Sequence, residues 1–184
     1  MSLLGRQARF FLALATLAVL ACFARPAHAW IETTVLTDDV RVEVDRAGMG
    51  VVEHTMQMRI RGGPLRALTL PGVDADAAPE GEPTASLLTK EGGQTESTVP
   101  LTVTMQPDAG LRIEINDGKG LGKGTYLIKL RYRTNLLGQG ALERDGAAIR
   151  LRWLGPKLPN GLDAAKTVFV LPAAPTEPRA AGER

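Results

Sequence analysis

The only histidine beyond the first 29 residues is His54, and imidazole is the side chain best suited to proton transfer near neutral pH. It stands in a run where Val52, Met56, Met58 and Ile60 alternate with polar residues, so it shares their apolar face. No second histidine follows the leader to complete a zinc site, and no serine stands in a Gly-x-Ser-x-Gly motif. We therefore expect a hydrogen-bonded histidine of the core or its boundary, and we predict no enzyme activity, no metal and no cofactor.

Four carboxylates, Asp74, Asp76, Glu80 and Glu82, fall in a stretch rich in Ala, Asp, Glu, Pro and Gly (residues 73–83). Ca²⁺ favours several oxygen ligands, but this spacing matches no EF-hand loop. The stretch also has no periodic apolar positions. It predicts a solvated acidic loop rather than a calcium site.

A glycine-rich segment, residues 118–125, superficially resembles a phosphate-binding loop. Lys123 occupies the position where that motif requires glycine. The segment also leads into a strand pattern, so no helix N-terminus would stabilise a bound phosphate. We expect a flexible connection between strands.

Basic residues alternate with apolar ones in residues 124–134 and again in residues 149–153. If these two strands are neighbours, one sheet face holds five outward cations: Lys129, Arg131, Arg133, Arg150 and Arg152. Such a face could bind an anionic surface, for instance lipid headgroups or acidic glycans. The alternative, which we favour, is that acidic residues on neighbouring strands, such as Glu43, Asp45 and Glu114, neutralise it.

Period-2 alternation and turn residues divide the chain into short strands. The predicted strands are residues 40–44, 52–60, 65–70, 84–90, 99–105, 111–115, 124–134, 149–153 and 167–171. A turn at residues 107–110 joins two of them. We predict an all-β domain at residues 30–172, an antiparallel β-sandwich of immunoglobulin-like architecture with Tyr126 and Trp153 buried between its sheets. Residues 173–184 read as a Pro/Ala-rich tail or linker.

The first 29 residues are typical of a secretory signal peptide. Arg6 and Arg9 precede an uncharged apolar run (residues 10–23), and Ala27-His28-Ala29 supplies small residues for cleavage. A helix of that run would be about 21 Å long, short of the roughly 30 Å needed to cross a bilayer. We expect export with cleavage after Ala29. An uncleaved anchor, or a lipoprotein attached through Cys22, stays open.

The charge balance changes when the leader is removed. Three of the 22 basic residues and none of the 20 acidic ones precede Trp30, which leaves 19 basic against 20 acidic. A net charge of −1 gives no support for nucleic-acid binding. The only cysteine, Cys22, lies in the leader, so the mature chain would form no internal disulfide.

Several short motifs resemble the exported N-terminal domain of a bacterial family of predicted membrane proteins, domain of unknown function 2207. They are Val51-Val52-Glu53, the Gly-x-Tyr strand from Gly124 to Tyr132, Trp153, and Phe169-Val170-Leu171-Pro172. Two features depart from the family: Leu68-Thr69-Leu70-Pro71 replaces an Arg-x-Ile-Pro-like segment, and no transmembrane helix follows before residue 184. The chain is therefore either a soluble variant or the front part of a longer protein. The resemblance implies no established activity.

We therefore expect a non-catalytic, exported interaction or sensory module at the bacterial cell envelope. Its partner would be another envelope protein or a downstream membrane segment of the same chain. The alternative is a domain that binds an anionic polymer or lipid through its basic strand face.

Overall fold

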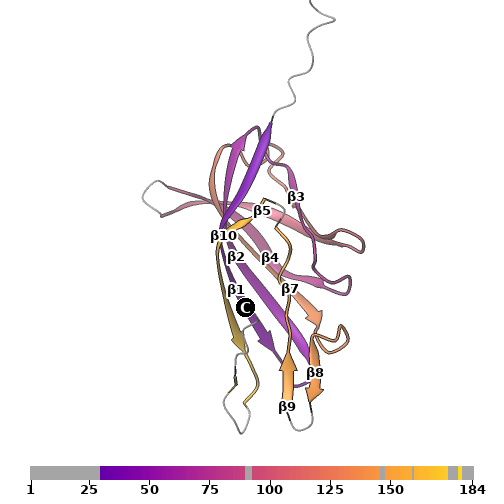
Figure 1. The fold of residues 1–184 in the computed structure, drawn as a ribbon. Helices are drawn as coiled ribbons and strands as arrows, with labels where there is room; N and C mark the ends of the chain where they lie inside the picture. The colour runs from indigo at the N-terminus through magenta and orange to yellow at the C-terminus, as the bar shows by residue number, and fades with distance from the viewer. Residues whose placement is uncertain (1–29, 90–92, 146–147, 159, 174–177, 180–184) are drawn as a thin grey trace, which may run out of the picture.

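The computed structural model describes residues 30–89, 93–145, 148–158, 160–173 and 178–179. These residues form ten strands and no helix (Figure 1). In chain order the strands are β1 (Ile31–Val44), β2 (Met49–Gly62), β3 (Ala67–Leu70), β4 (Ala78–Leu88), β5 (Gln94–Gln106), β6 (Gly110–Ile115), β7 (Gly124–Asn135), β8 (Leu142–Asp145), β9 (Ala148–Leu151) and β10 (Leu162–Val170). The all-β prediction is confirmed.

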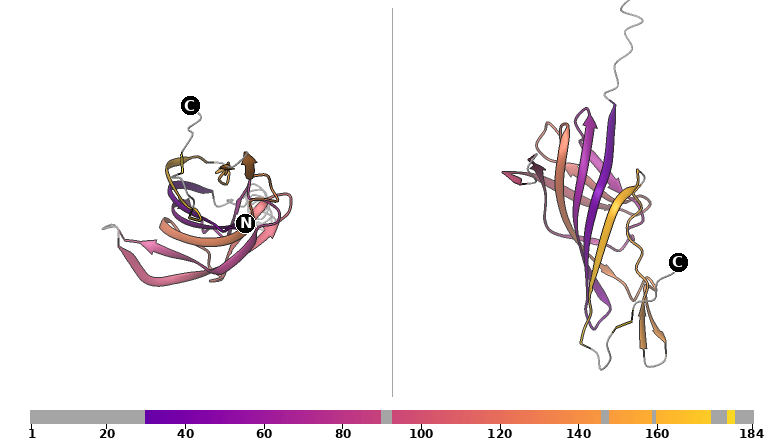
Figure 2. Two further views of the ribbon diagram at one scale, coloured as in Figure 1. Left: turned by 90° about the horizontal axis from the view of Figure 1, so that it is seen from below. Right: turned by 60° about the vertical axis from the view of Figure 1, so that its left-hand side comes forward.

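Eight strands make one sheet in the order β10-β1-β2-β7-β4-β5-β6-β3, and β8 pairs only with β9. Every pairing is antiparallel except that of β1 with β10, which is parallel. The sheet curls strongly, as the end-on view in Figure 2 (left) shows. One curled, mixed sheet therefore replaces the purely antiparallel pair of sheets that we predicted.

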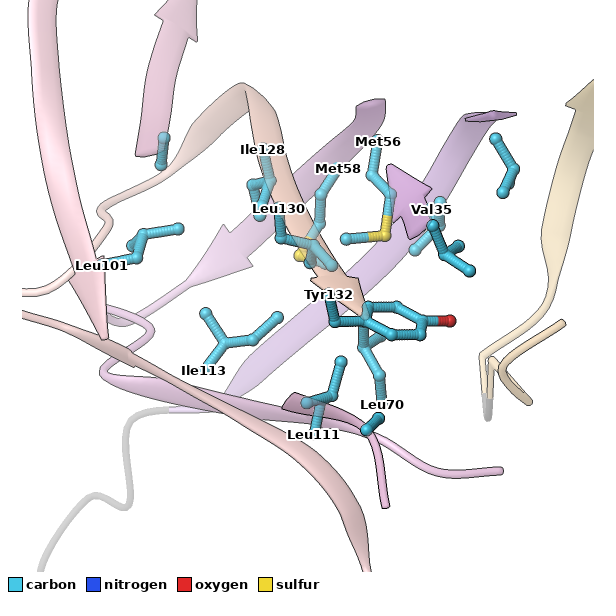
Figure 3. Close-up of a cluster of buried hydrophobic side chains, with 14 of the residues drawn as sticks. Val35, Met56, Met58, Leu70, Leu101, Leu111, Ile113, Ile128, Leu130 and Tyr132 are labelled. Carbon is cyan, nitrogen blue, oxygen red and sulfur yellow. The ribbon is translucent and has the colours of Figure 1, made fainter. Parts of the chain in front are cut away.

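The curl brings the two halves of the sheet face to face over one core. Figure 3 shows Met58 and Ile128, from β2 and β7, facing Leu101, Leu111 and Ile113 from β5 and β6. Met58, Ile128, Leu111 and Ile113 are each at most 2% exposed. Burial of these apolar surfaces is the main force that holds the curl, because removing each such side chain from water contributes about 1.5–3 kcal/mol.

In β7 burial alternates from Ile128 to Thr134, with Ile128, Leu130 and Tyr132 buried and Lys129 and Arg131 exposed, whereas Tyr126 and its neighbour Leu127 are both buried. In β1 the alternation changes phase at a register shift between Val35 and Thr37. Both Val35 and Asp38 consequently point inward, although they are three residues apart. The bulge thus places a carboxylate inside the sheet.

Three segments differ from their predicted structure. Much of the acidic stretch, expected to be a loop, belongs to β4, which starts at Ala78 and pairs with β7 across a shift between Glu80 and Thr84. β8 falls in a stretch for which we predicted no strand. Ile149, expected to face inward, is 70% exposed, and Trp153 lies beyond the end of β9 and is only half-buried. The burial predicted for Tyr126 is confirmed.

The turn predicted at residues 107–110 joins β5 to β6 and depends on Gly110. Its φ is 93°, and a Cβ there would lie 2.2 Å from the Leu70 carbonyl oxygen. Glycine is needed at this position both for the dihedral angle and for the close approach of β3.

Residues 152–158, which we call the strap, cross the open side of the curled sheet between β9 and β10. The Lys157 amide donates to the Pro71 carbonyl, just after β3, at 2.7 Å. Beyond the strap, the Asn160 side chain donates to the Thr33 carbonyl in β1 at 2.9 Å. The connection is thus tied to elements near both edges of the sheet, and Trp153 and Leu158 point from it toward the core.

Candidate functional site

Three polar side chains meet inside the curled sheet. The Nδ1 atom of His54 (β2) lies 2.9 Å from Oδ2 of Asp38 (β1), and its Nε2 atom lies 3.5 Å from the hydroxyl of Tyr132 (β7). The rings of His54 and Tyr132 stack with centroids 5.8 Å apart. His54 is 0%, Tyr132 3% and Asp38 4% exposed. The core position predicted for His54 is confirmed, with a carboxylate as its hydrogen-bond partner.

The roles of the two imidazole nitrogens depend on which of them carries the proton. Asp38 can accept a hydrogen bond from Nδ1–H, which leaves Nε2 free to accept one from the Tyr132 hydroxyl. Burial raises the pKa of the Tyr132 phenol far above its ordinary value, and the negative charges of Asp38 and Asp74 raise it further. Tyr132 therefore stays protonated and remains a donor.

The strap covers this trio. The Trp153 ring lies 6.5 Å from the His54 ring and 6.3 Å, edge to face, from the Phe169 ring in β10. An aspartate–histidine pair is a familiar arrangement for proton transfer, which requires a substrate within hydrogen-bonding reach. With every member of the trio nearly inaccessible, the geometry fits a stabilising polar network.

The five cations predicted to share one face separate into two groups. Lys129, Arg131 and Arg133 lie on β7, which pairs with β2 and β4. Arg150 lies on β9, which pairs with β8, and Arg152 follows in the strap. The single patch required β7 and β9 to be neighbours, and they are not.

The β7 cations lie among acids and hydroxyls. Glu80 on β4 binds both Arg131, at 3.1 Å, and Arg133, at 2.8 Å. On its other side Arg131 is the cross-strand partner of Glu53 in β2. Two of the five cations, Arg131 and Arg133, are thus paired with an acid on a neighbouring strand, and this acid, Glu80, is not among those we named.

A hollow of about 460 Å³ opens on the outer face near the ends of β1, β2 and β10. Its walls combine the apolar Val51, Val170 and Leu171 with charges of both signs, including Glu43 and Arg133. Because both signs line it, the hollow offers no clear preference for an anion.

The acidic stretch makes protein contacts rather than a cation site. Asp76 accepts hydrogen bonds from the Thr134 hydroxyl at 3.1 Å, the Asn135 amide at 3.2 Å and the Gln139 side chain. Glu80 is committed to two arginines. Among the residues that the structure describes, no three histidines, cysteines or acids group as metal ligands.

The glycine-rich segment connects β6 to β7, as predicted. Leu121 anchors it: this side chain is 2% exposed, and its main chain exchanges two hydrogen bonds of 2.8 Å with Leu65. The segment is therefore pinned at its middle rather than free along its length.

Exposed apolar side chains gather in the C-terminal third, a feature that our sequence reasoning missed. Ten large apolar side chains are exposed in the described residues, and six of them lie between residues 149 and 171: Ile149, Leu154, Leu162, Val168, Phe169 and Leu171. An uninterrupted apolar run from Val168 to Leu171 was the available signal, but such a run is equally typical of a buried strand.

No protein-family model matches the chain, and no curated protein matches it either. In the described part of the chain, no helix has the length and apolar character needed to cross a membrane. The predicted signal peptide and Cys22 lie outside the described residues. Similarity to domain of unknown function 2207 thus depends on the short motifs given above.

Proposed function

We propose that this protein is a non-catalytic, exported interaction module of the bacterial cell envelope. The residues best suited to chemistry, Asp38, His54 and Tyr132, are sealed in the core. By contrast, large apolar side chains are exposed to solvent on β9, the strap and β10. A module that binds through this surface fits both facts, because exposed apolar patches commonly mark interaction sites.

The observation on which this proposal depends is the exposure of Phe169 and Leu154, which are 43% and 81% accessible. Phe169 belongs to the edge strand β10, and Leu154 follows Trp153, the strap residue whose ring contacts Phe169. Aromatic residues such as Phe169 are enriched at the centre of protein interfaces. Phe169 lies on the inner face of β10 and Val168 on its outer face, so the proposed interface includes both sides of this edge strand.

Export and placement are part of the same proposal. The Arg6/Arg9 segment, the apolar run and Ala27-His28-Ala29 favour a cleaved leader. The partner would then be another envelope protein or a membrane segment that follows residue 184. We also propose that the fold is immunoglobulin-like in its general architecture, with the two facing halves of the curled sheet in the place of the two sheets of a sandwich.

Sequencing the N-terminus of the exported protein tests its processing. We expect Trp30 as the first residue. A chain beginning at a lipidated Cys22, or one that retains the leader, would contradict cleavage after Ala29.

Photo-crosslinking in the exporting cell tests the binding surface. A benzophenone amino acid is placed at Phe169 or Leu154, and as a matched control at the exposed Thr104 on β5, which is far from β10 in the sheet order. We expect one adduct of defined mass from the two test positions and none from the control. An absence of defined adducts at Phe169 and Leu154, or equal adducts at all three positions, would overturn the proposal.

A further inference from the structure

β10 ends the sheet and has one partner only. It pairs with β1 in parallel, in a register that runs from Val35↔Leu162 to Glu43↔Val170. Within the described residues no hydrogen bond reaches β10 from its other side. Every residue from Leu162 to Phe169 is exposed. The N–H and C=O groups on that side thus present a ready template for another strand.

The strap is beside this free edge but does not pair with it. In Figure 2 (left) β10 and the strap both lie at the open side of the curl. Trp153 and Phe169 touch edge to face at 80°, and no main-chain hydrogen bond between the strap and residues 162–170 accompanies that contact. A side-chain contact, rather than a strand ladder, joins the two elements.

We propose that β10 binds an extended segment of a partner protein as an added antiparallel strand. This inference rests on the proposed function and names the form in which the partner binds. Main-chain hydrogen bonds would supply affinity, and the alternating side chains of β10 would supply selectivity. We assign the antiparallel direction because antiparallel pairing is the more stable per residue.

The two faces of β10 define the partner's chemistry. Thr167 and Phe169 face the inner side, where their β1 partners Val40 and Val42 point, so the partner needs an apolar residue opposite Phe169. Lys166 faces outward and makes no ion pair with Asp39, its neighbour on β1. An acidic residue opposite Lys166 is therefore expected.

A second copy of this chain fits less well. Two copies of β10 related by a two-fold axis would pair most fully with Lys166 at the centre. The two lysines would then face each other directly, and like charges in that position are destabilising. A central lysine is also a common device against edge-to-edge self-association.

A synthetic nine-residue peptide tests the pairing against the full chain labelled with ¹⁵N. The peptide has leucine opposite Phe169, glutamate opposite Lys166 and β-branched residues elsewhere. Two further versions are N-methylated on alternate residues, one in each phase. Only one phase faces β10, so we expect that phase to abolish the amide shifts in β10 and the other to preserve them. Equal binding of both methylated peptides, or no binding by any peptide, would overturn the proposal.

Exchanging the charges of Lys166 and of the peptide's glutamate tests the register in which the peptide pairs with β10. Replacing the peptide's glutamate by lysine, or making Lys166→Glu, should each weaken binding about fivefold, and combining the two should restore most of it. Lys129→Glu on β7, away from the edge, is the matched control and should leave binding unchanged. Equal effects of Lys129→Glu and Lys166→Glu would show that net charge rather than pairing governs binding.

The two proposals fail separately. Adducts at Phe169 together with equal binding of both methylated peptides would leave an interaction surface but remove strand addition. Dimerisation of the chain that competes with the peptide would make a second copy the occupant and overturn the assignment to a different protein.

Discussion

The inner face of β2 and the free edge of β10 differ in where their polar groups lie and in what those groups bind. On β2, His54 is completely buried, and both ring nitrogens face partners at 2.9 and 3.5 Å. On β10 the main-chain groups of one whole edge face solvent beside exposed apolar side chains. The side chains suited to proton transfer are thus buried away from any ligand, whereas the accessible main-chain and apolar groups of β10 are suited to binding.

The largest expected effect comes from breaking the inner network. Asp38→Ala would leave a buried imidazole without its carboxylate, which should lower the free energy of unfolding by about 3–5 kcal/mol. Chemical denaturation measures it. Asp39→Ala is the matched control, because Asp39 is exposed on the outer face and its loss should change stability by no more than about 0.5 kcal/mol. Similar losses for both variants would contradict the difference between the two faces.

Trp153→Ala tests the strap. The side chain is half-buried and contacts both His54 and Phe169, so we expect a loss of about 2 kcal/mol in unfolding free energy, less than for a fully buried tryptophan. Phe169→Ala should cost less, since Phe169 is 43% exposed. A larger loss for Phe169→Ala, measured by the same denaturation, would show that β10 is more tightly held than its exposure indicates.

Tyr132→Phe should lower the free energy of unfolding by about 1 kcal/mol at neutral pH, through loss of the contact to His54. Burial raises the pKa of Tyr132 above its unfolded value near 10.0, so folding favours the protonated phenol. That contribution is complete below pH 10 and is lost as the pH rises above it. The variant should therefore lose less stability between about pH 9 and 11.5 than the wild type. Parallel curves for the two proteins would contradict burial of the phenol.

Glu80→Gln should have the smallest effect on folding, below about 1 kcal/mol, because its arginine partners are about half exposed. The variant frees Arg131 and Arg133, so it should elute from a heparin column at higher salt than the wild type. Glu82→Gln is a matched control at a nearby exposed carboxylate. Strong retention of the unmutated chain would instead favour the anionic-ligand alternative.

The sequence was sufficient for the all-β class and for the orientation of side chains on β2 and β7. Alternation placed His54 inside and Lys129, Arg131 and Arg133 outside because both strands hold one phase around these residues. The same rule could not find Asp38, since the bulge after Val35 changes the phase of β1 and nothing in the local pattern marks it.

The sequence also could not predict which strands pair with each other. Arg150 and Arg152 were grouped with the β7 cations because residues 149–153 alternate like a sheet strand, whereas β9 pairs only with β8. The parallel pairing of β1 with β10 is likewise set by the tertiary fold, because neither strand contains a residue pattern specific to a partner so distant in sequence.

That pairing of the first strand with the last also governs when the fold can be finished. Val35 pairs with Leu162, 127 positions later in the chain, so the ladder with the greatest sequence separation can form only after nearly the whole domain has emerged. Contacts this distant slow folding, because a long loop must close before they form. Until then β1 is itself a bare edge, exposed to mispairing and to proteolysis. A chain of this design would benefit from a chaperone that holds it until its C-terminal strand arrives.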